Sequence, residues 1–198
     1  MKGLILDTTL KRSYVAVIDG EREEIRYFDE SLSTQSALIP ACREALSALG
    51  ISPADLDGIA AVVGPGSFTG IRIGVAFANA VAFAVSTTRF SFTSFDLMRF
   101  VRPDAPCYMI DAGHNSAYVA RLVNGVLVEE NMEKIGLPEG TVDQKDIIED
   151  LPKGAIFALR KALEEKIFSA YAPTAETPYL KPNYMRKSQA ERMKDRQE

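Results

Sequence analysis

Two aspartates, Asp7 and Asp111, each follow an apolar run and are the residues of this chain best placed for phosphate or metal chemistry. At the ends of strands that face a common cleft, such carboxylates orient a metal-bound water or the phosphates of a nucleotide. They are useful only with a cation or a proton between them, because two nearby carboxylates repel each other. An Asp at a strand end also often caps the following turn through its own side chain. Both interpretations stay open for this pair.

A glycine-rich string at residues 64–74 (GPGSFTGIRIG) joins the apolar run 59–63 to a long Ala-rich segment. The pattern predicts a strand, a tight loop and a helix start, since Gly tolerates positive φ and Ser67 or Thr69 can cap the helix. Backbone N–H groups and the helix dipole at such a terminus favour an anion. The string lacks the lysine of a P-loop and has the spacing G-x-G-x-x-x-G, so a purely structural turn is the alternative. The candidates for anion or nucleotide contact are Asp7, Thr8, Thr9, Gly64, Gly66, Ser67, Thr69 and Asp111.

The residue types needed for hydrolysis or for a transition metal are sparse. A nucleophilic Ser67 or Thr69 would need a neutral base, and the sequence holds a single histidine, His114, for which an exposed turn is expected. Cys42 and Cys107 lack metal-ligand spacing and sit in apolar contexts, so we expect buried, reduced thiols. The sequence therefore predicts neither catalytic residues nor a metal site.

Composition is that of a globular protein, with 198 residues of which 46% are hydrophobic and 25% charged. The net charge of −4 argues against a large nucleic-acid footprint. The basic stretch 181–196 is interpreted either as a solvated tail or as a segment that makes weak contacts with phosphate groups. The uncharged segment 73–88 is too short and too weakly apolar for a membrane span, and the first residues leave no room for a secretory signal. We expect a cytoplasmic protein that does not contact a membrane.

A duplicated unit organises the chain. Residues 4–9 followed by 14–16 correspond to 108–113 followed by 118–120, and each unit then reaches a turn dipeptide, Asp19-Gly20 or Asn124-Gly125. Each copy therefore predicts an antiparallel meander, which is how both lobes begin in the actin-like, RNase H-like ATPases. The repeat resembles these ATPases, and this resemblance implies an α/β fold: a two-lobed actin-like ATPase (RNase H-like) fold with duplicated mixed-sheet lobes. The lobes are placed at 1–102 and 103–176, with a C-terminal connector and helical tail at 177–198.

Two helices are predicted between the copies, at 33–49 and 70–87, and a short one later at 158–168. Residues 133–150 are expected to form loops with one short helix, and a last helix is expected at 185–196. In the 70–87 helix a small residue recurs every four positions, which lets another helix approach closely. That face either packs against the 33–49 helix inside the chain or forms a subunit interface. The predicted partner interface comprises Leu38, Cys42, Ala45, Gly70, Gly74, Ala78 and Ala82.

Four segments together resemble the TsaB (YeaZ) family, the partner protein in synthesis of the threonylcarbamoyladenosine modification of tRNA. They are the glycine string 64–74, the opening 4–9, the strand 106–112 and the ending 178–186. The chain departs from the family pattern at 34–36 (TQS, where His-Ser-Glu is common), at Gly113 (where Arg is usual) and at Ser116 (where Glu is usual). It is also shorter than typical. These departures concern nucleotide chemistry and leave the glycine string intact.

The resemblance implies a non-catalytic subunit of the tRNA N6-threonylcarbamoyladenosine (t6A37) synthesis complex, which pairs with a TsaD-like paralogue through the two helices and activates it. It also implies a TsaE-like ATPase, contact with tRNA through the complex, and a homodimer when the chain is alone. No tightly bound cofactor is expected in this chain, while ATP with magnesium would be used by the partner subunits. The alternatives are an independent actin-like ATPase or kinase using Asp7 and Asp111, or a homodimeric binding module.

Overall fold

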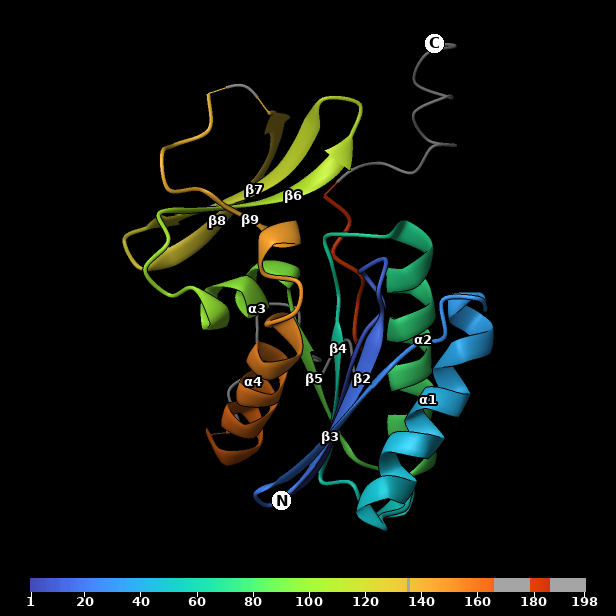
Figure 1. Ribbon diagram of the computed structural model, residues 1–198. Coiled ribbons are helices and arrows are strands. Elements are labelled where there is room, and N and C mark those ends of the chain that lie inside the picture. The colour runs from blue at the N-terminus through green and yellow to red at the C-terminus, as the bar shows by residue number, and fades with distance from the viewer. Residues whose placement is uncertain (135, 166–178, 186–198) are drawn as a thin grey trace.

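The computed structural model describes residues 1–134, 136–165 and 179–185. Two mixed sheets stand one above the other, with helices on both faces of the first (Figure 1). The strands are β1 (Lys2–Asp7), β2 (Tyr14–Asp19), β3 (Arg22–Tyr27), β4 (Gly58–Val62), β5 (Thr88–Phe92), β6 (Cys107–Gly113), β7 (Ser116–Val123), β8 (Val126–Glu133) and β9 (Val142–Asp143). The helices are α1 (Thr34–Leu49), η1 (Pro53–Asp55), α2 (Phe68–Ala84), α3 (Ser94–Val101), η2 (Gln144–Asp146) and α4 (Leu151–Glu165).

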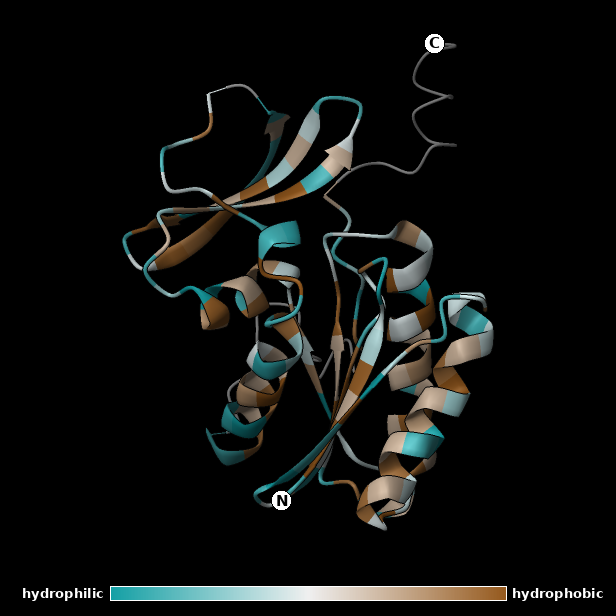
Figure 2. Cartoon of the chain, viewed as in Figure 1, coloured by the Kyte–Doolittle hydropathy of each residue, from teal (hydrophilic) through white to brown (hydrophobic). Residues whose placement is uncertain are grey.

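The first sheet has the order β3-β2-β1-β4-β5, antiparallel from β1 to β3 and parallel from β1 through β4 to β5. Its central strands β1 and β4 are buried on both faces, and Figure 2 shows brown, hydrophobic residues along the strands of this sheet. Alternate residues therefore point into two separate cores. One core includes Leu4 and Leu6 of β1, and the other includes Ile5.

Helices α1 and α2 cover one face of this sheet, and α3 and α4 cover the other (Figure 1). Helix α1 runs where it was predicted because Ser33 caps its start through Ser36 N, and Gly50 ends it with a φ of 70°. Helix α4 starts before the predicted 158–168 helix, and it packs on β1, β2 and β5 although it falls within the predicted second lobe. Its buried residues explain this placement, because they form one apolar stripe that fits the open face of the first sheet. They are Leu151, Pro152, Gly154, Ala155, Ile156, Ala158, Leu159 and Ala162.

The second sheet has the order β8-β7-β6-β9 and contains the second meander. In the first copy Asp7 lies opposite Tyr14, whereas in the second a bulge after Asp111 sets that residue opposite Ala117. The Asn124-Gly125 turn forms as predicted, with Val123 opposite Val126. The meander was thus anticipated on both sheets, but its register is not the same in the two copies.

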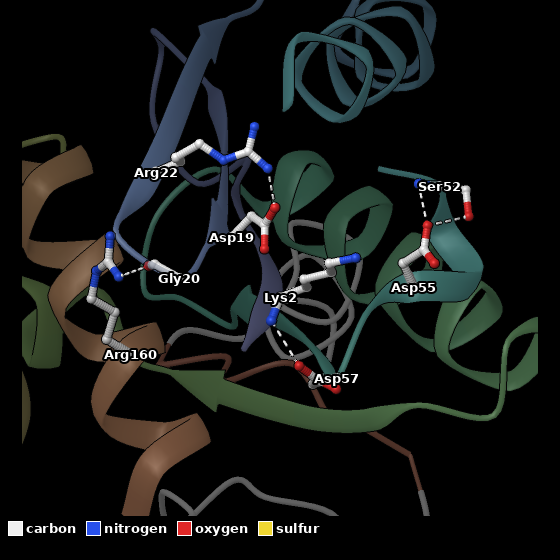
Figure 3. Close-up of polar contacts among 8 residues, drawn as sticks. All are labelled: Lys2, Asp19, Gly20, Arg22, Ser52, Asp55, Asp57 and Arg160. Carbon is white, nitrogen blue, oxygen red and sulfur yellow. Dashed lines mark hydrogen bonds and ion pairs between the residues drawn. The ribbon is translucent and has the colours of Figure 1, made fainter. Parts of the chain in front are cut away.

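Polar contacts fasten the end of the first sheet that carries the N-terminus, as Figure 3 shows. The backbone N–H of Lys2 donates to Asp57 Oδ2 at 2.7 Å, and Arg160 of α4 donates to the carbonyl of Gly20 in the β2–β3 turn. The Asp55 carboxylate accepts from Ser52 N at 2.8 Å, which fixes the turn before β4. These contacts hold α4 and the turn before β4 at this end of the sheet, opposite to the end at which the glycine loop follows β4.

Among the described residues, no helix is both long enough and apolar enough to cross a membrane. The region 133–150 contains the short strand β9 followed directly by η2; one short helix was expected there, whereas the strand was not predicted. The last helix predicted at 185–196 lies outside the described residues, apart from Met185. The same holds for most of the basic stretch 181–196.

Candidate functional site

The glycine loop connects β4 to α2 and takes the backbone form that its sequence predicts. Gly64 and Gly66 have φ values of 113° and 156°, which side chains other than hydrogen rarely allow. Ser67 is the N-cap of α2, and its hydroxyl accepts from Gly70 N at 3.2 Å. Ser67 and Thr69 are exposed at the start of the helix. The loop is therefore a tight turn with backbone angles that glycine readily adopts, followed by a capped helix.

The loop rests directly on the backbone that leaves β1. Ser67 N donates to the Thr9 carbonyl at 2.8 Å, and the Thr8 hydroxyl donates to the Gly70 carbonyl at 2.7 Å. A Cβ added to Gly70 would lie 1.8 Å from the Thr8 carbonyl oxygen, and one added to Gly66 would lie 2.7 Å from the Thr9 carbonyl oxygen. Close packing of two backbone segments thus accounts for these glycines without a ligand. This favours the structural turn, while anion contact by Ser67 or Thr69 stays a prediction.

Asp7 is buried at the end of β1, with an exposure of 1%. Its Oδ1 accepts from Thr9 N at 2.9 Å and from Thr9 Oγ1 at 2.6 Å, which is the turn-capping role. Burial raises the pKa of Asp7 to about 6, while the Thr9 hydrogen bonds oppose that rise. Opposite it on β2, the buried Tyr14 hydroxyl has no hydrogen-bond partner among the described residues. Because a carboxylate and a phosphate carry like charges, an ionised Asp7 would repel a phosphate unless a cation lay between them.

Asp111 is exposed and has its own local partners. Its Oδ1 lies 2.8 Å from Lys134 Nζ and accepts from Gly113 N at 2.7 Å. Hydrogen bonding to Lys134, helped by Gly113, lowers the pKa of Asp111. The two aspartates are thus each engaged by residues of their own lobe, Asp7 by Thr9 and Asp111 by Lys134 and Gly113. Within residues 1–134, 136–165 and 179–185, no group of three or more His, Cys, Asp or Glu residues is arranged to hold a metal ion.

The other residues considered for chemistry are the histidine and the two cysteines. His114 lies exposed in the β6–β7 turn with a φ of 51°. Cys42 and Cys107 are buried free thiols, as expected, and burial raises the pKa of Cys42 to about 12. A thiol with that pKa stays protonated and unreactive at neutral pH.

The seven residues predicted at a partner interface are buried within the chain itself. Ala45, Ala78 and Ala82 each have an exposure of 0%, because these stretches of α1 and α2 face the first sheet. Gly74 faces β1 so closely that an added Cβ would lie 2.2 Å from Thr8 Oγ1. The structure corrects the residue-level prediction: internal packing occupies this face. The buried residues are Leu38, Cys42, Ala45, Gly70, Gly74, Ala78 and Ala82.

A second stripe of small residues on α2 was missed, and it is exposed. Ala76, Ala80 and Ala84 repeat every four positions on the outer side of the helix. Near it, Phe83 is 72% exposed, and Ile39 of α1 is 55% exposed. We call the exposed residues Ile39, Ala76, Ala80, Phe83 and Ala84 the outer face. The sequence signal was present, since both stripes have the same spacing and differ only by an offset of two residues.

An apolar groove of about 430 Å³ opens between α1 and α2. Its wall includes Ile39 from the outer face, the partly buried Phe77 and Val81 of α2, and Leu46 of α1. Grooves that are mostly apolar, with few polar groups, suit the side chains of a packed helix. The complete lining is Leu4, Ile39, Cys42, Arg43, Leu46, Ser47, Ile51, Ser52, Pro53, Leu56, Phe77 and Val81.

Comparison with known proteins matches residues 31–138, more than half of the chain, to the family described as TsaD: tRNA N6-adenosine threonylcarbamoyltransferase. A Pseudomonas aeruginosa crystal structure, described as an uncharacterized protein similar to peptidase YeaZ, is 22% identical with a TM-score of 0.68, covering 93% of this chain and 99% of that one. YeaZ from Pseudomonas aeruginosa is 21% identical with a TM-score of 0.67, covering 92% and 99%. The family match and the likeness of fold to YeaZ confirm the resemblance stated from the sequence, and the predicted α/β class with two mixed sheets is confirmed. The chain thus belongs to the TsaD family and has the fold of YeaZ.

Proposed function

We propose that this protein is a non-catalytic subunit in the synthesis of t6A37 on tRNA, and that it binds and activates a TsaD-like transferase through the outer face of α1 and α2. The observation that carries the proposal is the exposed stripe of Ala76, Ala80 and Ala84 beside an apolar groove. Small side chains let two helices approach closely, and Phe83 and Ile39 add apolar area next to the contact. The pair of helices is thus suited to receive two helices from a partner.

A TsaD-like paralogue is the partner that we propose because the chain itself belongs to the TsaD family. Two members of one family carry the equivalent helices on the equivalent face, so they can pair in the manner of a two-fold dimer. The same reasoning allows a homodimer when the paralogue is missing. A TsaE-like ATPase and tRNA would then join the complex rather than this chain alone.

The non-catalytic role is supported by how the candidate groups are used. Asp7 is buried and holds Thr9, Asp111 is held by Lys134, and the glycine loop is seated on Thr8 and Thr9. In each case the contact gives the residues a structural role and occupies their charged or backbone groups. The transfer step, and the use of ATP with magnesium, would therefore belong to partner subunits.

The test is an Ala80→Arg variant, with Phe157→Arg on α4 as the matched control. Phe157 is 48% exposed on the opposite side of the first sheet, so the control adds the same charge to another exposed helix. Ala80→Arg is expected to stay folded and to weaken binding to the TsaD-like transferase by on the order of a hundredfold or more, because an unpaired charge would be buried in the contact. Calorimetric titration measures it. Equal binding by the two variants would refute the outer face as the pairing surface.

The alternatives give different results in the same preparation. A homodimeric binding module would form a dimer that the TsaD-like transferase does not dissociate, which light scattering after gel filtration reports. An independent ATPase or kinase would show magnesium-dependent turnover by the pure protein that is lost in Asp7→Ala. Either result would replace the proposal.

A further inference from the structure

Residues 179–185, here called the strap, return to the first lobe after α4 and lie along α2 (red in Figure 1). Leu180 is 3% exposed and belongs to the core between α1, α2 and the first sheet. The side-chain amide of Asn79 on α2 forms two hydrogen bonds with the backbone of the strap. Leu180 N donates to Asn79 Oδ1 at 2.9 Å, and Asn79 Nδ2 donates to the Leu180 carbonyl at 3.1 Å. The strap is therefore a fixed part of the first lobe.

Asn183 connects the strap to the glycine loop and to the second sheet. Its backbone N–H donates to the Val63 carbonyl at 2.8 Å, just before Gly64. Gly64 is needed there, since an added Cβ would lie 2.8 Å from the Asn183 carbonyl oxygen. The Asn183 side chain is 8% exposed, and its Nδ2 donates to Oε2 of Glu129 on β8 at 2.9 Å. One residue thus touches both lobes.

Glu129 is itself part of a three-way junction. Its carboxylate accepts from the Asn183 amide and also from the Thr93 hydroxyl, which caps α3 in the first lobe. Thr93 in turn accepts from Asp96 N at 3.0 Å. Partial burial raises the pKa of Glu129, and the nearby charge of Asp96 adds to the rise. The junction therefore joins β8, the start of α3 and the strap.

We propose that the Asn183–Glu129 hydrogen bond is an interlobe clamp, which sets the orientation of the second sheet relative to the glycine loop. The lobes also meet through apolar side chains such as Tyr108 and Ile110 of β6, which pack with α3 and α4. Apolar contact is non-directional, whereas a hydrogen bond to a carboxylate requires a defined distance and angle. The apolar contact holds the lobes together and the clamp fixes how they face each other. This inference goes beyond the proposed function and does not depend on it.

The test uses charge repulsion and its rescue. Asn183→Asp places a second carboxyl group against Glu129, and the repulsion opens the clamp at about pH 9, where both groups are ionised. Glu129→Gln added to that variant restores a donor, because the Gln amide can donate to the new Asp. Tyr184→Phe is the matched control, since it removes the 3.0 Å hydrogen bond from Arg72 Nε on the same strap without touching Glu129.

The measurement is the distance distribution between spin labels on Ala48→Cys of α1 and Glu133→Cys of β8, both exposed positions. The native Cys42 and Cys107 are buried and remain unlabelled in the folded protein. Asn183→Asp is expected to broaden the distribution to at least twice the native width, and the double variant and Tyr184→Phe to return the native width. An Asn183→Asp variant that unfolds but is refolded by Glu129→Gln also supports the clamp. A native width in Asn183→Asp, or a double variant that stays broad or unfolded, overturns it.

Discussion

Asp7 is expected to make the protein less stable as the pH rises from 4 to 7. The folded protein holds the Asp7 proton more tightly than the unfolded chain, because burial raises the pKa from 3.8 to about 6. Unfolding then releases a proton in this pH range, so the free energy of unfolding falls as the pH rises. The group is neutral in both states well below pH 3.8, and its full cost is reached well above pH 6.

The magnitude follows from the size of the shift. A rise of roughly two pKa units at about 1.4 kcal/mol per unit corresponds to about 3 kcal/mol. Asp7→Asn removes the charge and keeps an oxygen that can accept from Thr9 N and Thr9 Oγ1. Relative to the wild-type protein, the variant should therefore gain about 2.4 kcal/mol of unfolding free energy between pH 4 and pH 7.

Urea unfolding of both proteins at half-unit pH steps measures the difference. Asp111→Asn is the control, because Lys134 and Gly113 lower the pKa of Asp111 and the exposed carboxylate stays ionised in both states above pH 5. The difference in unfolding free energy between Asp111→Asn and the wild-type protein should stay constant above pH 5. Parallel stability profiles for wild type and Asp7→Asn would refute the claim that a buried carboxylate is being titrated.

Three further predictions concern packing. Ala78→Arg buries a charge at a position with 0% exposure, so it should abolish the cooperative thermal transition, whereas Ala80→Arg should melt within a few degrees of wild type. Gly70→Ala forces a Cβ to within 1.8 Å of the Thr8 carbonyl oxygen and should lower the unfolding free energy by about 3 kcal/mol or more; denaturation at the wild-type midpoint would contradict this. Cys42, with a pKa raised to about 12 by burial, should react with a disulfide reagent at pH 7.5 only as fast as the protein unfolds, which stopped-flow absorbance at rising urea concentrations checks.

The sequence predicted the parts of the fold that local chemistry determines. The Asn124-Gly125 turn, the Ser33 cap and Gly50 define their elements within a few residues. The loop at 64–70 was identified because closely spaced glycines beside a proline are typical of a tight turn and are unfavourable inside a strand or a helix. What local pattern could not show is which distant segment a residue meets: Gly70 needs Thr8, and Gly64 needs Asn183.

The prediction of the partner interface on α2 failed for the same reason, because local pattern does not show which distant segment a residue meets. Small residues at 70, 74, 78 and 82 and at 76, 80 and 84 have one spacing, so periodicity alone could not say which set faces the sheet. Asp7 and Asp111 match in sequence, yet a bulge and Lys134 give the second a different partner. Helix α4 was assigned to the second lobe by its position in the chain, whereas its apolar stripe packs on the first.

The place of Leu180 in the first core has a consequence for how the protein is made. The core formed by β1, β2, β4, α1 and α2 receives a side chain that is synthesised about a hundred residues after α2. On the ribosome, the first lobe would therefore carry an unfilled apolar site while the whole second sheet and α4 are still being translated. Such exposed surface is what chaperones bind and what aggregates during synthesis. Loss of the strap, by a late nonsense codon or by proteolysis, would leave that site open in the finished chain.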